Sequence, residues 1–371
     1  MKKLLPEVCT IQYGFPFDSA KFSDSNGMPL IRIRDVVRGY SETYTTEEYK
    51  SEYIVHENDL LIGMDGEFNI AKWGKTPALL NQRVCRLAPK DSIDKDYLFY
   101  FMPIALKRIE EKTPFVTVKH LSAKELNKIE IPVLSLEEQR KIAETLSKVD
   151  KLIAFRDQQL AKLDEVVKAR FVEMYGESEY PCNSLISLII EGAGLSYGIV
   201  QPGDDGTGDM GVLRPVDFAD GKIKTDSIKY IDRSLGDGFK KTELNGNELL
   251  ITVRGTTGIT ALTDSRFKGM NVTRGIAVIR YDEKKIDPIY LNEYIKMEKS
   301  QQYIKEHTRG ATLQQINLSE LRDLEVVIPP LPLQRVFATF VERVDQQKQT
   351  VQQSFEKLEL MKKALMQEYF G

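Results

Sequence analysis

The sequence predicts an α+β fold: two globular α/β domains separated by two long helices that pair as an antiparallel coiled coil, with pseudo-twofold symmetry. Residues 117–176 and 312–371 align without a gap, and roughly 17 of about 60 positions are identical. Most of each aligned segment lacks internal proline and glycine and carries apolar residues at heptad spacing, which predicts a long helix. The sequence before each repeat is rich in short β-favouring stretches and glycine turns.

The first globular domain is predicted over residues 1–135. Strands are expected at residues 30–34 and 53–55, which are rich in β-branched residues or tyrosine. Glycines mark the turns between such stretches, at Gly27, Gly39, Gly63 and Gly66.

The first long helix is predicted over residues 136–176. Ser135 and Glu138 have the spacing of a capping box at its start, and Gly176 can close it in a left-handed cap. Its apolar stripe consists of Ile142, Leu146, Val149, Ile153, Leu160, Leu163, Val167 and Met174.

The second globular domain is predicted over residues 177–330, with strands at 249–253 and 275–279. It repeats parts of the first domain weakly, because 247–251 resemble 58–62 and 214–217 resemble 32–35. A short capped helix and a strand are expected at the end of each domain. The cap pairs are Ser122 with Glu125 and Asn317 with Glu320, and the strands span 129–132 and 324–327.

The second long helix is predicted over residues 331–371, with Pro332 in its first turn, where proline is tolerated. Its stripe consists of Phe337, Val341, Val344, Val351, Phe355, Leu358, Leu365 and Tyr369. A narrow stripe needs a partner, and the other long helix is the simplest one. Antiparallel pairing is favoured over parallel pairing, because the second domain would otherwise have to bridge back along the full helix.

Composition excludes some classes of protein. The net charge is −3 and apolar residues make up 42% of the chain, which suits a globular protein with sizeable cores. No apolar run approaches the length of a membrane span, and the three scattered cysteines fit a reduced, cytoplasmic setting. A strongly basic nucleic-acid-binding domain is absent, although basic residues gathered on one surface would still suffice. From the repeat alone, a reader of two-part DNA and a two-lobed scaffold that binds two protein copies are equally good hypotheses.

Catalytic motifs are weak. Gly206–Gly211 fits GxGxxG but lacks the preceding strand and following helix of a dinucleotide site. Asp217 with Asp220 and Lys222 resembles a nuclease pattern, and 287–290 distantly resembles an amino-methyltransferase loop; ordinary turns explain both. The three histidines have no metal-ligand spacing. The hypothesis of an enzyme therefore lacks a site.

The helix entry Leu-x-x-Gln-Arg, preceded by Ile-Pro or Ile-Pro-Pro, occurs at 136–140 and 331–335. This arrangement of two variable domains and two such helices resembles the specificity subunit of type I restriction–modification systems, over essentially the whole chain. One departure is that Leu134 and Ser135 stand where the second copy has Pro329 and Pro330.

The resemblance implies a non-catalytic subunit whose target recognition domains each read one half of a bipartite double-stranded DNA sequence. It implies that the helices set the spacing and dock two adenine-N6 methyltransferase subunits, which a motor and nuclease subunit can join. No cofactor is then expected in this chain: AdoMet belongs to the methyltransferase, and ATP and Mg to the motor and nuclease subunit.

Candidate DNA contacts are the forked donors, amides and cations in turns between strands, because these groups read base edges and phosphates. In the first domain they are Lys72, Lys75, Asn81, Gln82, Arg83 and Lys119. In the second they are Arg254, Thr256, Thr257, Arg266, Lys268, Asn271, Arg274 and Arg309, with Gln314 and Gln315 in place of Lys119 and His120. Candidate subunit-docking residues on the helices are Glu138, Arg140, Glu144, Lys148 and Arg343, for which an ordinary solvated face is an equally good explanation.

Overall fold

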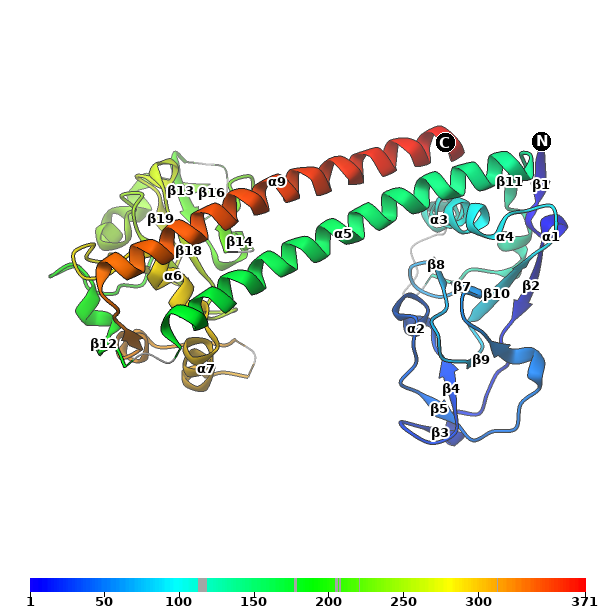
Figure 1. Cartoon of the computed structure of the whole chain (residues 1–371), viewed down its shortest axis with the longest axis horizontal. Helices are drawn as coiled ribbons and strands as arrows, with labels where there is room; N and C mark the ends of the chain where they lie inside the picture. Colours follow the sequence, from blue (N-terminus) through cyan, green and yellow to red (C-terminus); the bar gives the residue numbers. More distant parts are fainter. Residues whose placement is uncertain (113–118, 177–178, 204–205, 207, 220, 312) are drawn as a thin grey trace. The chain divides into compact units, whose positions relative to one another are not determined.

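The computed structural model describes residues 1–371 except 113–118, 177–178, 204–205, 207, 220 and 312. The first positions of the aligned repeats, Thr117, Val118 and Thr312, therefore lie outside the described residues. The chain divides into two compact units: unit 1 comprises Met1–Gln158 with Gln352–Gly371, and unit 2 comprises Gln159–Val351. Each unit combines one globular part with portions of two long helices (Figure 1).

Unit 1 is built on strands and four helices of its own, together with portions of the two long helices. Its helices are α1 (Leu5–Val8), α2 (Ile33–Arg38), α3 (Lys95–Lys112) and α4 (Ala123–Asn127), with 3-10 turns at Ser19–Lys21 and Ser51–Tyr53. Its strands are β1 (Lys2–Leu4), β2 (Cys9–Tyr13), β3 (Phe22–Ser23), β4 (Met28–Ile31), β5 (Tyr44–Thr45), β6 (Ile54–Val55), β7 (Leu60–Gly63), β8 (Asn69–Lys72), β9 (Ala78–Leu80), β10 (Val84–Pro89) and β11 (Glu130–Pro132).

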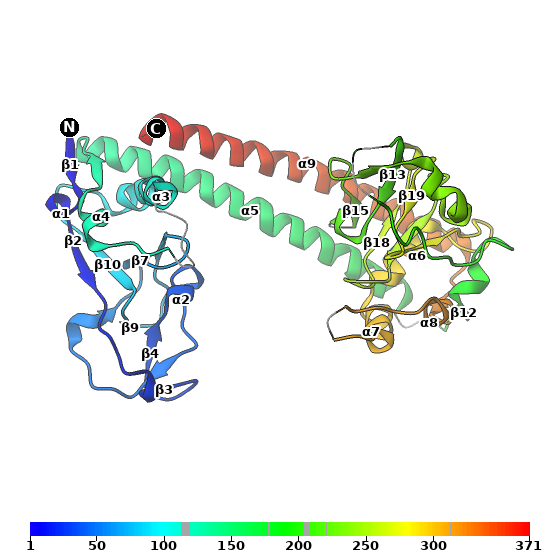
Figure 2. The same cartoon turned by 180° about the vertical axis from the view of Figure 1, so that it is seen from behind.

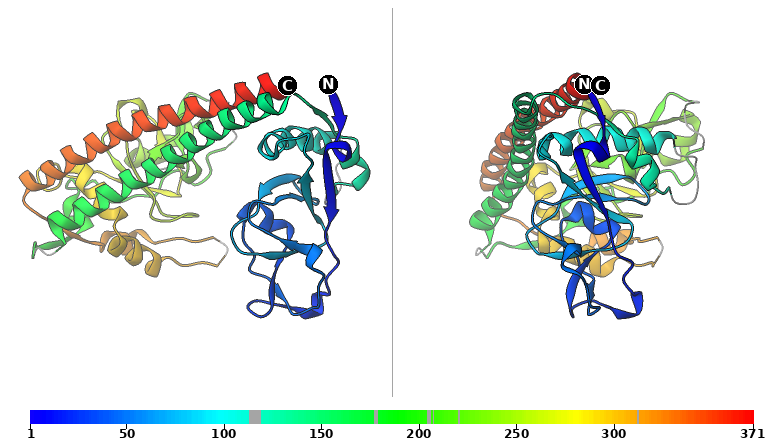
Figure 3. Two further views of the ribbon diagram at one scale, coloured as in Figure 1. Left: turned by 45° about the vertical axis from the view of Figure 1, so that its right-hand side comes forward. Right: turned by 90° about the vertical axis from the view of Figure 1, so that its right-hand side faces the viewer.

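A central antiparallel sheet in the order β2-β10-β7-β8 organises unit 1. One face packs Leu60 and Ile62 against α3, and the other packs Leu61 against Val36 of α2 and Leu80 of β9. Figure 3 shows α3, in cyan, between the long helices and the strands of this unit. A second sheet, β3-β5-β4-β9-β6, contains the parallel pair β4 and β9, and β1 pairs with β11.

Unit 2 repeats this plan with different lengths. Its helices are α6 (Pro288–Lys296), α7 (Glu298–His307) and α8 (Leu318–Arg322), with 3-10 segments at Leu185–Leu188, Pro215–Asp217, Arg233–Thr242 and Ser265–Phe267. Its strands are β12 (Cys182–Ser184), β13 (Met210–Leu213), β14 (Phe218–Ala219), β15 (Lys222–Ile223), β16 (Lys229–Ile231), β17 (Leu249–Thr252), β18 (Thr260–Leu262), β19 (Asn271–Val272), β20 (Ile276–Ile279) and β21 (Glu325–Val327).

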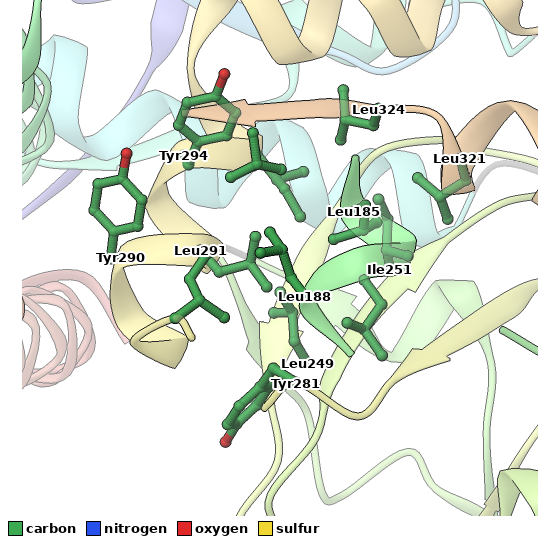
Figure 4. Packing of buried hydrophobic residues seen from close by; sticks show 14 of the residues in the cluster. Leu185, Leu188, Leu249, Ile251, Tyr281, Tyr290, Leu291, Tyr294, Leu321 and Leu324 are labelled. Carbon is green, nitrogen blue, oxygen red and sulfur yellow. The ribbon is translucent and has the colours of Figure 1, made fainter. Parts of the chain in front are cut away.

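The sheets of unit 2 correspond to those of unit 1. The antiparallel sheet β18-β17-β20 takes the place of β8-β7-β10, and β12 with β21 takes the place of β1 with β11. The parallel pair β13 and β19 matches β4 and β9 (Figure 2). Figure 4 shows the core, in which Tyr290 and Tyr294 of α6 and Leu249 and Ile251 of β17 point into one apolar cluster.

The long helices α5 (Leu136–Tyr175) and α9 (Leu331–Phe370) are each 40 residues long and pair antiparallel within each unit. In unit 1 the start of α5 lies beside the end of α9, and Lys362 Nζ is 2.7 Å from Asp150 Oδ1. In unit 2 the end of α5 lies beside the start of α9, and Lys348 Nζ is 2.6 Å from Asp164 Oδ1. All of the predicted stripe residues lie in α5 or α9 and are buried or half-buried. Both long helices and their apolar stripes are therefore confirmed.

The repeated glutamine of Leu-x-x-Gln-Arg fastens each long helix to its globular part. The Gln139 Oε1 accepts the N–H of Asp94 (2.7 Å), and its Nε2 donates to the carbonyls of Leu134 (2.9 Å) and Ser92 (3.3 Å). The Gln334 Oε1 accepts the N–H of Asp287 (2.8 Å), and its Nε2 donates to the carbonyl of Pro329 (2.7 Å). Both side chains are fully buried. An unpartnered buried amide costs about 1–3 kcal/mol, so these bonds specify how each helix leaves its domain.

Aromatic residues complete the same joint. Tyr97 of α3 donates its hydroxyl to the carbonyl of Pro132 (2.7 Å) and packs on Phe370, with ring centroids 5.3 Å apart. Tyr290 of α6 donates to the carbonyl of Val327 (2.8 Å) and packs on Tyr175, with centroids 5.2 Å apart. The aromatic-glycine endings of the two repeats are therefore structural equivalents.

The caps agree with the sequence prediction in part. Ser135 and Glu138 form the expected capping box, in which Glu138 Oε2 accepts from the N–H (3.0 Å) and hydroxyl (2.6 Å) of Ser135. These hydrogen bonds hold the pKa of Glu138 below its ordinary value. Ser122 accepts the N–H of Glu125 (3.2 Å), whereas Asn317 makes no side-chain cap bond, so the box expected there is wrong. Gly176 is also not in the left-handed region, because the N–H of Gly176 continues the helical pattern to the carbonyl of Val172 (2.7 Å).

One predicted strand is wrong in its second half. Residues 30–34 begin in β4, but Ile33 and Arg34 belong to α2. The carboxylate of Asp35 accepts the N–H of Arg32 (2.8 Å) and starts the helix there. The equivalent Asp217 accepts the N–H of Arg214 (2.7 Å), which confirms that 32–35 and 214–217 correspond.

Candidate nucleic-acid interface

In each unit, four backbone hydrogen bonds hold together the end of a central strand, the turn before its neighbour, and the segment that precedes the short helix. We call this arrangement the backbone frame. In unit 1 the bonds run from the N–H of Met64 to the carbonyl of Arg83 (2.9 Å), Leu121 to Met64 (2.7 Å), Gly66 to Lys119 (2.9 Å) and Gln82 to Phe15 (2.9 Å). In unit 2 they run from Val253 to Gly275 (2.8 Å), Ile316 to Val253 (3.0 Å), Gly255 to Gln314 (2.8 Å) and Arg274 to Ile199 (2.9 Å).

The frame makes the exposed positions of the two units comparable residue by residue. Met64 and Val253 follow the ends of β7 and β17, and each donates one frame bond and accepts another. Asp65 corresponds to Arg254, because each is the next residue in the chain. By the same criterion the other pairs are Gln82 with Arg274, Arg83 with Gly275, Lys119 with Gln314, and His120 with Gln315. The backbone hydrogen bonds are shared and the chemistry of the side chains is not, although Arg83 has a positive φ and Gly275 does not.

Three of the unit 1 candidates, Gln82, Arg83 and Lys119, lie on the frame. The Arg83 Nε is 3.7 Å from Asp65 Oδ2, and its Nη1 is 3.2 Å from the ring nitrogens of His120. The His120 Nδ1 is 2.5 Å from Asp65 Oδ1. Lys119 donates to the carbonyl of Glu110 (2.8 Å) and lies 3.7 Å from its carboxylate. The cations of this frame are therefore balanced by neighbouring acids.

The unit 2 frame gathers Arg254, Arg274 and Gln314, with Thr256, Thr257 and Arg309 beside them. Arg309 exchanges two backbone bonds with Gln315, each 2.8 Å long. The hydroxyls of Thr257 and Thr308 lie 3.1 Å apart. Within the described part of the chain, the guanidinium groups of Arg254 and Arg274 have no acidic partner, whereas Arg309 lies 3.7 Å from Glu320. This frame is more electropositive than the one in unit 1.

Four candidates lie at the opposite end of the central sheets. Lys72 pairs with Leu60 at the start of β7, and the frame begins beyond the other end, at Gly63. Its ammonium lies 2.8 Å from Asp96 Oδ1 and above the ring of Phe99. Lys75 follows on the exposed turn after β8. In unit 2, Arg266 and Lys268 lie beyond Leu262, which pairs with Leu249 at the start of β17.

Arg266 is already engaged with a carboxylate. Its Nη2 is 2.7 Å from Asp264 Oδ2, and this hydrogen bond lowers the pKa of Asp264. The structure therefore does not place Lys72, Lys75, Arg266 or Lys268 with the residues on the frames.

Asn81 and Asn271 are buried, and both use their side chains inside the fold. The Asn81 Oδ1 accepts the N–H of Gln82 (2.9 Å). The Asn271 Oδ1 accepts from Thr242 (2.8 Å) and from the N–H of Val272 (2.8 Å), and its Nδ2 donates to Phe239 (3.2 Å). Burial and these internal hydrogen bonds separate both amides from the exposed surface of the frames.

The sequence prediction missed Asp65 and His120 as frame residues, whereas it included Gln315 as the counterpart of His120. A signal for Asp65 was present, because the match of 58–62 with 247–251 continues at the same offset to Asp65-Gly66 and Arg254-Gly255. His120 and Gln315 come to the frame through bridges to residues 65 and 254, which are distant in sequence. That pairing is visible only in the tertiary structure.

The weak catalytic motifs have structural explanations. The Gly206–Gly211 pattern includes Thr207, outside the described residues, and Met210 and Gly211 start β13, which leads into a three-residue 3-10 turn and not into an α-helix. Asp217 is buried and bonded to Arg214, while Asp220 lies outside the described residues. Asp287 caps α6 through the N–H groups of Ile289 (2.9 Å) and Tyr290 (3.2 Å). Over the described ranges, no three His, Cys, Asp or Glu residues gather as metal ligands.

The five candidate docking residues are exposed on the long helices. Apolar side chains are exposed on the same helices, which the sequence analysis did not name: Leu152, Phe155, Val166, Val172, Leu333, Val336, Leu360 and Met361. In the part of the chain that the structure describes, none of the helices has the length and apolar character needed to cross a membrane.

Comparison with known proteins gives one consistent family. The family described as "Type I restriction modification DNA specificity domain" matches residues 1–165 and 207–360. The EcoBI specificity subunit of Escherichia coli, from a type I restriction enzyme, is 30% identical over 373 residues, which cover 92% of this chain and 78% of that protein.

Solved structures support the fold. The S subunit of a type I restriction–modification system from M. genitalium has a TM-score of 0.56 at 16% identity, covering 100% of this chain and 96% of that one. A chain from a structure on complex assembly and conformational transition of the type I R-M system has a TM-score of 0.58 at 16% identity, covering 100% and 97%. This chain therefore belongs to the specificity subunits of type I restriction–modification systems, the non-catalytic components that recognise the DNA target.

Proposed function

We propose that this chain reads a bipartite, asymmetric double-stranded DNA target, with one half-site for the recognition domain of residues 1–135 and the other for that of 177–330. The observation that carries the proposal is the backbone frame. It recurs in both units with matching hydrogen bonds, while the side chains that it presents differ at each of the five compared positions. Two copies of one scaffold with different exposed groups suit two different half-sites.

The proposed contact surface comprises the exposed and half-buried polar residues of the frames and their neighbours. They are Gln82, Arg83, Lys119 and His120 in unit 1, and Arg254, Thr256, Thr257, Arg274, Arg309, Gln314 and Gln315 in unit 2. Arginine and glutamine can form bidentate contacts with guanine and adenine, while lysine and threonine suit phosphates. In this proposal the buried Asn81 and Asn271 are parts of the fold. The cations at the opposite end of the sheets belong to a solvated surface; they are Lys72, Lys75, Arg266 and Lys268.

The helices of residues 136–176 and 331–371 would set the spacer between the half-sites. A helix of 40 residues is about 60 Å long. Two copies of one recognition domain suit the two half-sites of duplex DNA, which are related by a dyad. Inserting one heptad into both helices should then change the preferred spacer length, and an unchanged spacer would refute this role.

The same helices would dock two adenine-N6 methyltransferase subunits. Glu138, Arg140, Glu144, Lys148 and Arg343 offer charges, and the exposed apolar side chains on these helices offer area for a protein interface. A motor and nuclease subunit could join this complex. In the proposal AdoMet is bound by the methyltransferase subunits, ATP and Mg by the motor and nuclease subunit, and the complex works in the cytoplasm.

The test is the methylation pattern of a genome with the gene present and absent. The expected result is a two-part motif with methylated adenine that depends on this chain. Replacing residues 177–330 with the corresponding domain of another specificity subunit should change one half-site and preserve the other. Loss of both half-sites in a folded chimera would refute the assignment of one half-site to each domain. A protein-binding scaffold, the alternative function, predicts no methylated motif and no salt-dependent duplex binding by the complex.

A further inference from the structure

We infer that Arg83 and Arg254 are equivalent base-reading residues, and that each recognises one guanine of a half-site. They reach the same place on the two frames from different segments, Arg83 from the turn before β10 and Arg254 from the turn after β17. The inference rests on the proposed function and goes beyond it, by assigning one residue and one base in each half-site.

The arginine occupies a different one of two frame positions in each unit. Position 65 carries an aspartate and position 83 an arginine in unit 1. Their equivalents carry an arginine, Arg254, and a glycine, Gly275, in unit 2. In unit 1 the side chains of positions 65 and 83 meet, because Arg83 Nε lies 3.7 Å from Asp65 Oδ2. A long side chain from either position can therefore supply a guanidinium to this spot, and each unit supplies one.

Arg83 is held in a costly conformation. Its φ is 72°, in the left-handed region that favours glycine, and the only other non-glycine residue with positive φ among those described is Asn58. Strained backbone is retained where the side chain has a specific task. About half of the Arg83 side chain is exposed (52%), while Asp65 and His120 hold its other side. We therefore assign Asp65 as a positioning residue for Arg83.

Unit 2 cannot use position 275 in the same way. A Cβ on Gly275 would lie 2.7 Å from Cγ of Pro215, so a larger side chain there requires the proline ring or the turn to shift. Arg254 supplies the guanidinium from the end of β17 instead. The nearby acid, Glu320, faces His307 at 3.8 Å and Arg309 at 3.7 Å, and Arg254 is without an acidic partner among the residues that the structure describes.

The chemistry of the group names the base. A guanidinium presents two parallel N–H donors, which match the O6 and N7 acceptors of guanine in the major groove. A lysine keeps the charge and loses this fork. The Arg-to-Lys substitution therefore separates base reading from attraction to phosphate.

The test compares Arg83→Lys and Arg254→Lys in the full complex with its methyltransferase subunits, with the methylated motif as readout. Each variant should lower discrimination for guanine at one position of one half-site by roughly 5- to 150-fold, the range for one bidentate pair. The other half-site should be unchanged and reports that the complex is folded. Arg266→Lys, at the opposite end of the unit 2 sheet, is the matched control and should leave the motif intact.

A transfer variant tests the equivalence. Arg83→Gly should lose the guanine, and Asp65→Arg combined with Arg83→Gly should recover part of it, because the arginine then stands where unit 2 carries Arg254. Recovery of at least several-fold over Arg83→Gly alone supports the inference, and no recovery overturns the equivalence. Asp65→Asn should weaken discrimination in the first half-site only.

The outcomes separate this inference from the proposed function. Without a bipartite motif in the unaltered complex, the proposed function fails and the inference fails with it. A bipartite motif with a half-site of A·T pairs alone overturns the inference only. The inference alone is also overturned if both lysine variants keep their guanine discrimination within twofold, or if they weaken methylation equally at all sequences.

Discussion

The two frames have matching backbone hydrogen bonds and different electrostatic character. In unit 1, Arg83 and Lys119 are balanced by Asp65 and Glu110. In unit 2, Arg254 stands at the position of Asp65, and the described residues give neither it nor Arg274 an acidic partner. Hydrogen bonds between main-chain groups do not depend on side-chain identity, so the frame tolerates this replacement. Sequence can therefore diverge on the frame without loss of the fold, which is what a pair of recognition domains requires.

The helix joints behave in the opposite way. Gln139 and Gln334, with Tyr97 and Tyr290, make matching bonds in the two units. These bonds come from buried side chains, and their geometry depends on the identity of each residue. The comparison separates positions that carry the architecture from positions that are free to carry specificity.

The largest effect is expected where both units need a glycine for close chain crossing. A Cβ on Gly14 would lie 1.9 Å from the carbonyl oxygen of Asn81, and one on Gly198 would lie 1.9 Å from that of Val272. Gly14→Ala and Gly198→Ala should each lower the free energy of unfolding by about 3 kcal/mol, measured by urea denaturation. Gly238→Ala is the control, because nothing lies within 4 Å of its Cβ position. Equal, small effects for all three variants would contradict the shared crossing.

A smaller effect is expected at the helix joints. Gln139→Ala and Gln334→Ala should each cost about 2 kcal/mol, because they leave buried backbone groups without partners. Gln139 makes three such bonds and Gln334 two, so Gln139→Ala should be the more destabilising. Gln158 and Gln353 also occupy equivalent positions of the repeat but are exposed, and their alanine variants serve as controls. If Gln139→Ala or Gln334→Ala has the same free energy of unfolding as these controls, the glutamine does not specify that joint.

The smallest effect tests single hydrogen bonds in the two joints. Burial raises the pKa of Tyr97 to about 12, and it also raises that of Tyr290, so both hydroxyls stay protonated and donate at neutral pH. Tyr97→Phe and Tyr290→Phe should each lower the free energy of unfolding by about 1 kcal/mol. Tyr40→Phe, at an exposed site, should be neutral. Thermal unfolding of the three variants measures the difference, and a cost in one unit alone would show that the joints are unequal.

Local sequence signals predicted the elements whose stability is local. Heptad spacing predicted both long helices and their buried stripes, and Ser135 with Glu138 predicted the capping box. The signal failed where two local preferences competed: β-branched residues favoured a strand at 33–34, but the carboxylate of Asp35 starts a helix there. Asn317 shows the converse case, because a residue with the right spacing makes no cap bond.

The candidate site was predictable in chemistry and only partly in place. Arg83, Lys119, Arg254, Arg274 and Gln314 were found from their positions in turns, and the frame brings them together within each unit. Asn81 and Asn271 have the same amide chemistry as a base reader, yet burial turns both inward. Burial depends on which segments cover a residue, and those segments are far away in sequence.

The sequence by itself determined that the protein is a repeat with two long helices and two different domains. Apolar periodicity and the identity between the repeats are properties of the order of residues. The tertiary structure alone decided which of the polar turns share a frame, and that His120 and Gln315 lie beside Asp65 and Arg254 on it. Those relations come from hydrogen bonds between segments dozens of residues apart. The free energy of such contacts depends on a backbone that exists only once the domain has folded.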